Sequence, residues 1–111
     1  MIFWVVTRRR EVALQIKADL QELASEIKIQ VFTEERDFMD AACEDDLPFL
    51  IITDGTINAS AGNYATSYCE EIRHFARDHD VIHIAFGPFG YCPWLLKVKI
   101  KLLLLILKNR I

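Results

Sequence analysis

A single carboxylate at the end of an apolar segment is the residue of this chain best placed to do chemistry. Asp54 closes the run Phe49-Leu50-Ile51-Ile52-Thr53, and Gly62 follows it eight residues later. Such a run predicts a buried parallel strand, and open α/β sheets bind their ligands beyond the carboxyl ends of these strands. A carboxylate there could accept a phosphoryl group, provided that Mg²⁺ and a further cation stabilise the transferred charge.

A run of basic residues, Thr7-Arg8-Arg9-Arg10, follows the first apolar segment and would reach the same edge of a sheet. The arginines could bind phosphate at the start of the next helix, form a solvated turn, or pair with Asp54. In the last case, the charge of an arginine would replace the charge of a metal ion beside Asp54.

Histidines and cysteines offer no second centre of chemistry. His74, His79 and His83 have no spacing that forces a carboxylate pair or a metal site, so we predict structural or solvated roles. The three cysteines are widely spaced and form no CxxC pair, which predicts reduced thiols in a cytoplasmic protein.

Strand and helix patterns alternate along the whole chain. The apolar or alternating segments 2–6, 27–31, 49–53 and 81–85 predict strands. Residues 11–24, the segment after Thr33, 63–77 and 94–108 have the spacing of amphipathic helices. This order predicts one α/β domain over residues 1–111, with a parallel sheet covered by helices on both faces.

The features around Asp54 and near the C-terminus together resemble the receiver domain of two-component response regulators, the CheY-like family. The first are Leu47-Pro48 before the strand, Asp54 and Gly62, with Ile57-Asn58 where the family has Met-Pro. The second is Gly87-Pro88-Phe89, followed by Pro93 and a basic, leucine-rich helix. The resemblance covers almost the whole chain and implies a flavodoxin-like three-layer sandwich with Asp54 as the phospho-acceptor.

Departures from the family pattern fall on the groups that the chemistry needs. The resemblance places the Mg²⁺-binding acidic pair on Thr7 and Arg8, the phosphate-sensing hydroxyl on Ala85, and the lysine on Gly87. Arginine supplies no oxygen ligand and repels the cation. We therefore expect a degenerate pocket, a lost Mg²⁺ site, no cofactor and an inactive Asp54.

The chain is also shorter than a receiver. It shows four strands and four helices, whereas the family has five of each, so we predict that one βα unit is missing. That deletion would expose a sheet edge and helix faces that are otherwise covered.

The last predicted helix, 94–108, is apolar on nearly its whole circumference. Its predicted interface face consists of Trp94, Leu95, Val98, Leu102, Leu105 and Ile106. A second apolar face consists of Leu96, Ile100, Leu103 and Leu107. Helices of this kind are buried on more than one side, but a four-stranded sheet offers only one. We predict a homodimer or another protein partner through this helix, with unusually deep burial in the monomer as the alternative.

Composition fits a globular protein, with 52% apolar and 26% charged residues. Residues 1–80 carry 16 acidic and 8 basic side chains, a net charge of −8, whereas residues 81–111 carry +5 and no acid. This split could mark a surface for nucleic acid, but we favour a basic helix that covers an acidic body. No DNA-binding motif is present, and the apolar run 102–107 is too short to cross a bilayer.

Three functional hypotheses follow. The favoured one is a pseudo-receiver that is not an enzyme and that acts in two-component signalling or a phosphorelay through protein–protein contacts. The second is a regulator that still accepts phosphate on Asp54. The third is a small flavodoxin-like enzyme or ligand binder that uses Thr7 to Arg10 and Asp54.

Overall fold

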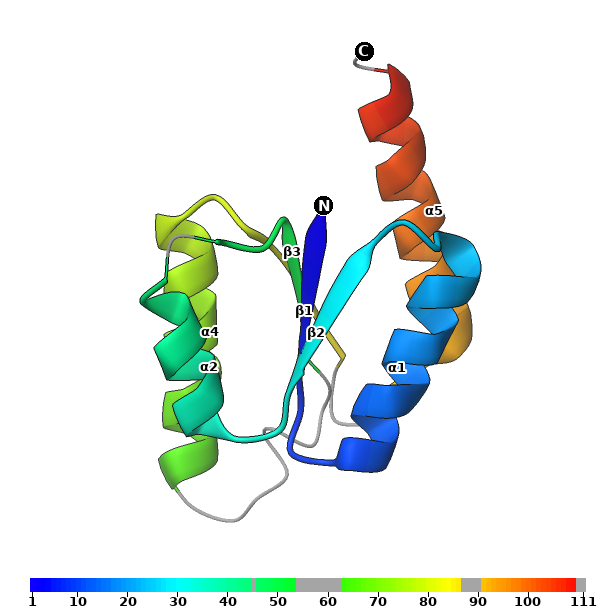
Figure 1. Ribbon diagram of the computed structural model, residues 1–111. Coiled ribbons are helices and arrows are strands. Elements are labelled where there is room, and N and C mark those ends of the chain that lie inside the picture. Colours follow the sequence, from blue (N-terminus) through cyan, green and yellow to red (C-terminus); the bar gives the residue numbers. More distant parts are fainter. Residues whose placement is uncertain (45, 54–62, 87–90, 110–111) are drawn as a thin grey trace.

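Strands and helices alternate along the described chain. The computed structural model describes residues 1–44, 46–53, 63–86 and 91–109 (Figure 1). In chain order its elements are β1 (Ile2–Val6), α1 (Arg10–Leu23), β2 (Lys28–Phe32), α2 (Glu35–Ala42), β3 (Leu50–Thr53), α4 (Asn63–Asp78), β4 (Ile82–Ala85) and α5 (Pro93–Asn109). The predicted elements are all present, with small shifts in their boundaries.

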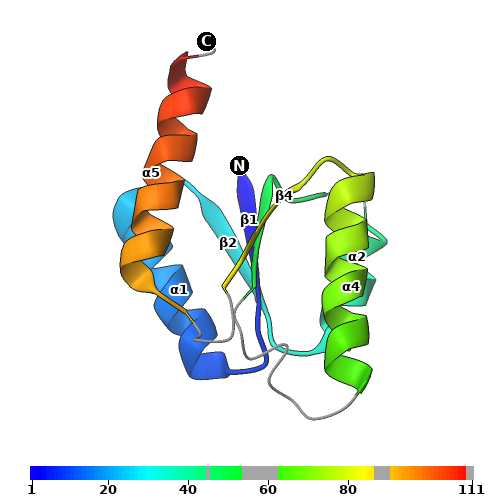
Figure 2. The same cartoon turned by 180° about the vertical axis from the view of Figure 1, so that it is seen from behind.

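The described strands form one parallel sheet in the order β2-β1-β3-β4. β2 and β3 lie on opposite sides of β1, and because parallel crossovers are right-handed, α1 and α2 must cover opposite faces. Figures 1 and 2 show α1 and α5 on one face of the sheet and α2 and α4 on the other. The predicted α/β fold is therefore confirmed, as a flavodoxin-like three-layer sandwich with one βα unit fewer among the described residues.

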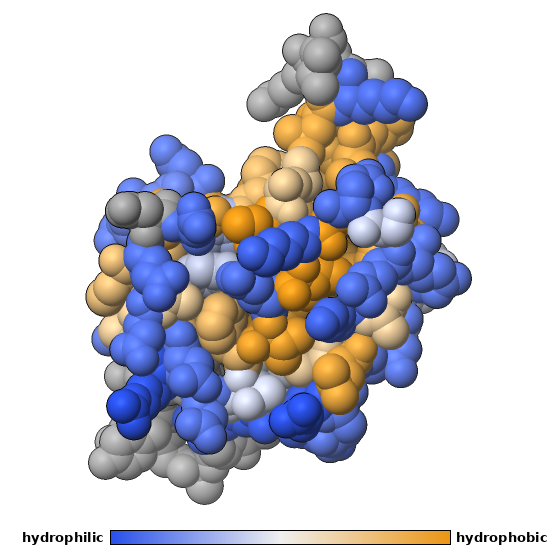
Figure 3. All heavy atoms as spheres, viewed as in Figure 1, coloured by the Kyte–Doolittle hydropathy of each residue, from blue (hydrophilic) through white to orange (hydrophobic). Residues whose placement is uncertain are grey.

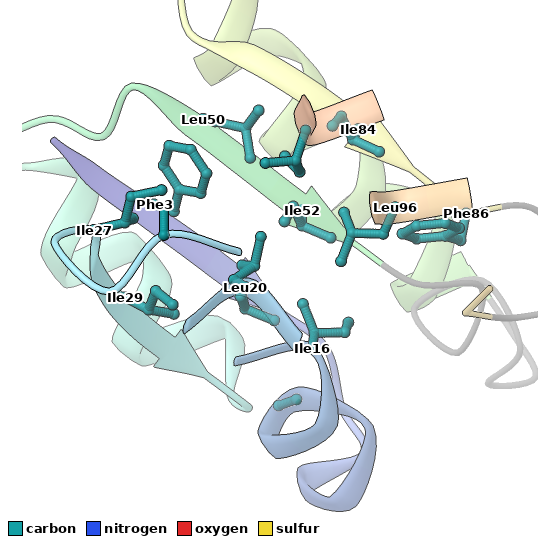
Figure 4. Packing of buried hydrophobic residues seen from close by; sticks show 14 residues of the cluster. Phe3, Ile16, Leu20, Ile27, Ile29, Leu50, Ile52, Ile84, Phe86 and Leu96 are labelled. Carbon is teal, nitrogen blue, oxygen red and sulfur yellow. The ribbon is translucent and has the colours of Figure 1, made fainter. Parts of the chain in front are cut away.

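Alternate side chains of β1 and β3 enter two separate cores, which explains why these two central strands are continuously apolar from Ile2 to Val6 and from Leu50 to Ile52. Phe3 and Val5 of β1 face α1 and α5, where Leu20 and Leu96 are fully buried (Figure 4). Burying a leucine of this kind contributes about 1.5–3 kcal/mol.

An aromatic cluster fills the opposite core, between the sheet and helices α2 and α4. The Trp4 ring lies with its centroid 5.2–6.0 Å from the rings of Phe32, Phe38 and Phe75. Trp4 is 1% exposed, and its indole N–H has no hydrogen-bond partner among the described residues. Its fluorescence should therefore respond to changes at β1.

Helix α5 begins at Pro93, one residue before the predicted start, because proline fixes the backbone for the first helical position and its missing N–H costs nothing there. Only part of α5 lies against the body, and its C-terminal part projects beyond the sheet (Figures 1 and 2). None of the described helices has both the length and the apolarity that a bilayer-spanning helix requires.

Candidate functional site

The carboxyl ends of β1, β3 and β4 lie side by side at one edge of the sheet. Val6 pairs with Thr53, and Thr53 pairs with Ala85. The ladder continues beyond the strands, because the Phe86 N–H donates to the Thr53 carbonyl at 2.9 Å. The edge between β1 and β3 is also where the strand order reverses, which is the usual ligand position in open α/β sheets.

As far as the structure describes them, the sequence-predicted pocket residues lie along this edge of the sheet. Thr7 and Arg8 directly follow β1, and Ala85 ends β4. Asp54 and Gly87 lie outside the described residues. The edge thus presents a threonine, an arginine and an alanine methyl at the positions that the receiver resemblance assigns to metal ligands and a hydroxyl.

Thr7 has a local structural role at the turn into α1. Its side chain is buried, and its Oγ1 accepts a hydrogen bond from the Arg9 N–H at 3.3 Å. Arg8, Arg9 and Arg10 are exposed. The Arg9 guanidinium lies 3.2 Å from Glu11 and, after a backbone hydrogen bond, is the second cause of the lowered pKa of that carboxyl. The start of α1 is therefore a basic, solvated surface.

Thr53 and His83 form a polar pair beside this edge that the sequence interpretation missed. The Thr53 Oγ1 lies 3.0 Å from the His83 Nε2, and the hydroxyl donates or accepts according to the imidazole tautomer. Burial, and then the charge of Arg73, lowers the pKa of His83, so the neutral ring is favoured. Because Thr53 is only 3% exposed, the pair links β3 to β4 rather than presenting a nucleophile to solvent.

A second polar centre, also missed, lies between α1 and the segment that enters α5. The Tyr91 hydroxyl donates to Asp19 Oδ2 at 2.5 Å, and Gln15 Nε2 donates to Asp19 Oδ1 at 3.0 Å. Burial and the bond to Asp19 raise the pKa of Tyr91, so the phenol stays protonated. The available sequence signal was an acid, Asp19, within the apolar stripe of α1 that includes Ile16 and Leu20.

The outer face of α5 is apolar and uncovered. Its members are the predicted interface residues, with exposed fractions of 72% for Trp94, 36% for Leu95 and Val98, 55% for Leu102, 54% for Leu105 and 53% for Ile106. The opposite face is covered, since Leu96 and Ile100 are fully buried. The alternative of deep burial in the monomer is therefore wrong. Figure 3 shows apolar surface over the projecting part of α5.

A hollow of about 440 Å³ lies elsewhere, between β2 and α2. It is lined mainly by acidic and apolar side chains, among them Asp37, Asp40, Glu44 and Phe32. Among the described residues, no three His, Cys, Asp or Glu side chains converge as a metal site would require.

Comparisons of this chain with protein-family models, with curated proteins and with solved structures found no match. The features that bear on function are therefore the carboxyl edge of the sheet and the surface of α5.

Proposed function

We propose that this protein is a receiver-like signalling module that acts through protein–protein contacts and without Mg²⁺-dependent phosphorylation. The observation that supports this most directly is the chemistry of the carboxyl edge. Arg8 stands beside the buried Thr7 where a working receiver would carry its carboxylate pair, and Ala85 brings a methyl group to the end of β4.

Phosphoryl transfer depends almost entirely on positioning and on charge stabilisation. Mg²⁺ requires several oxygen ligands in near-octahedral geometry, and an exposed arginine at the same edge opposes its binding. Losing the metal ligands and the sensing hydroxyl together removes both the catalysis and the response to phosphate. An interaction role remains, supported by the apolar outer face of α5.

The test is the mass of the intact protein after incubation with Mg²⁺ and acetyl phosphate. We expect no mass gain in the wild type. A gain of one phosphoryl group that disappears in Asp54→Asn would overturn the proposal and establish Asp54 as a working acceptor.

A gain-of-function variant sharpens this test. Restoring the acidic pair with Thr7→Asp and Arg8→Asp should create Mg²⁺ binding, measured as a saturable change in the fluorescence of the buried Trp4. The matched control is Arg9→Asp with Arg10→Gln, which changes the formal charge by the same amount but leaves the position that aligns with the pair untouched. Equal Mg²⁺ responses in both double variants would contradict the receiver-like geometry.

A further inference from the structure

The outer face of α5 has a spacing that reads the same in both directions. Its exposed apolar residues lie two, five and six positions before Ile100 and two, five and six positions after it. They are Val98, Leu95 and Trp94 on one side and Leu102, Leu105 and Ile106 on the other. Ile100 itself is fully buried on the opposite face, so the symmetry belongs to the exposed stripe alone.

We propose that this stripe binds a second copy of the same chain, with the two α5 helices antiparallel about a two-fold axis at the level of Ile100. This inference rests on the interaction role proposed above and names the partner. A two-fold contact is self-complementary, so that residue i meets residue j and residue j meets residue i. The stripe meets this condition: Val98 faces Leu102 of the second copy, Leu95 faces Leu105, and Trp94 faces Ile106.

The shape of the molecule favours the antiparallel direction. The first turns of α5 lie against the body, and Leu103 and Leu104 still pack partly against its core, whereas the end of the helix projects beyond the other described elements (Figures 1 and 2). Antiparallel packing places each projecting part beside the packed part of the other α5, so every residue of the stripe is covered. It also sets the two helix dipoles in opposite directions, which is favourable, whereas a parallel pair would place like ends of the dipoles side by side.

The apolar area is sufficient for a specific contact. The exposed side chains of the stripe offer on the order of 500 Å² per copy, the size of the largest apolar patch on a typical monomer, and such patches are often functional. Two copies together reach about 1,000 Å², the lower limit for a biological interface. Helix α5, with 17 residues, is about 25 Å long, so the stripe uses most of its length.

Lysines flank the stripe and make the direction testable. In the antiparallel pair, Lys101 lies close to the axis and therefore beside Lys101 of the second copy. Lys108 lies at the far end, beside Trp94 of the second copy. Reversing the charge at position 101 should therefore change the share of mixed dimers formed with the wild type, whereas the same change at position 108 should not.

The first experiment measures molar mass by light scattering over a range of protein concentrations. We expect a dimer for the wild type, a monomer with an unchanged circular dichroism spectrum for Leu102→Gln with Leu105→Gln, and a dimer for the control Leu14→Gln. Leu14 is 48% exposed on α1 and so matches the size and exposure of the altered residues. A monomeric wild type, a dimeric double variant, or a mass that keeps growing through head-to-tail contacts overturns the inference.

The second experiment mixes wild type with Lys101→Glu and counts mixed dimers by native mass spectrometry. We expect more mixed dimers than random pairing gives, and a random share when the wild type is mixed with Lys108→Glu. A random share with Lys101→Glu overturns the antiparallel pairing. Neither experiment depends on phosphate. If the protein does not dimerise, the phosphorylation test therefore still tests the proposed function independently.

Discussion

At the scale of single residues, the threonine hydroxyls at the carboxyl edge already form hydrogen bonds with neighbouring residues. Thr7 accepts a backbone hydrogen bond from Arg9, and Thr53 contacts His83. A hydroxyl in such a contact orders the turn or strand around it and is poorly placed to react. The polar residues of this edge therefore stabilise the fold, while the arginines give the surface its charge.

The Thr53–His83 pair predicts a pH dependence of stability. Because burial lowers the pKa of His83 in the folded state, the unfolded state binds a proton first as the pH falls below about 6.5. Stability is complete above that pH and is lost as the pH falls through the folded pKa. For His83→Gln, the free energy of unfolding can be measured with urea between pH 7.5 and about 5. This part of its pH dependence should be lost.

The matched control for that measurement is His74→Gln, since His74 is exposed on α4. Because this variant keeps the contact between Thr53 and His83, it should retain the pH dependence of stability that His83 contributes. A wild-type slope in His83→Gln would show that other groups carry the pH dependence and that the imidazole is not held neutral by its surroundings.

At the scale of elements, the contact between α1 and α5 depends on polar links as well as on the core. The Tyr91–Asp19 hydrogen bond connects the segment before α5 to the middle of α1. Nearby, the Lys97 Nζ lies 3.8 Å from Glu22 Oε2, an exposed pair that contributes little. The Tyr91–Asp19 bond is therefore the polar contact most able to fix where α5 starts.

Tyr91→Phe should lower the free energy of unfolding by about 1–3 kcal/mol, because a buried carboxylate loses one of its two donors. Urea unfolding measures the change. A double-mutant cycle with Asp19→Ala isolates the pair, since alanine removes the acceptor and directly bonded residues are not additive. Additive effects of the two substitutions would contradict the importance of this bond.

At the scale of the whole molecule, charge and apolar surface are both unevenly distributed. A basic helix lies against an acidic body, and its outward face carries the exposed apolar stripe. Lys97 and Glu22 connect the two charge regions within one chain. Uncovered apolar surface of this size is typical of a binding site and is otherwise an aggregation liability.

If that surface is covered by a second copy, stability must depend on concentration. A tenfold higher protein concentration should stabilise the folded dimer by about 1.4 kcal/mol and raise the midpoint of thermal unfolding. Leu102→Gln with Leu105→Gln should have a midpoint that does not change with concentration. A wild-type midpoint that is equally constant would count against a dimer coupled to folding.

The elements, the parallel sheet and the two apolar faces of α5 could all be predicted from the amino-acid sequence. The buried positions of an element repeat with the period of a helix or a strand, so the pattern of neighbouring residues in the sequence predicts them. The tertiary structure established that the body covers α5 on one face only, because the pattern of a helix that is apolar nearly all round also allows deep burial in the monomer. It also decided the polar pairs Thr53–His83 and Asp19–Tyr91, whose members are 30 and 72 residues apart. Such contacts depend on strand order and helix packing, which join distant parts of the chain and leave no local pattern.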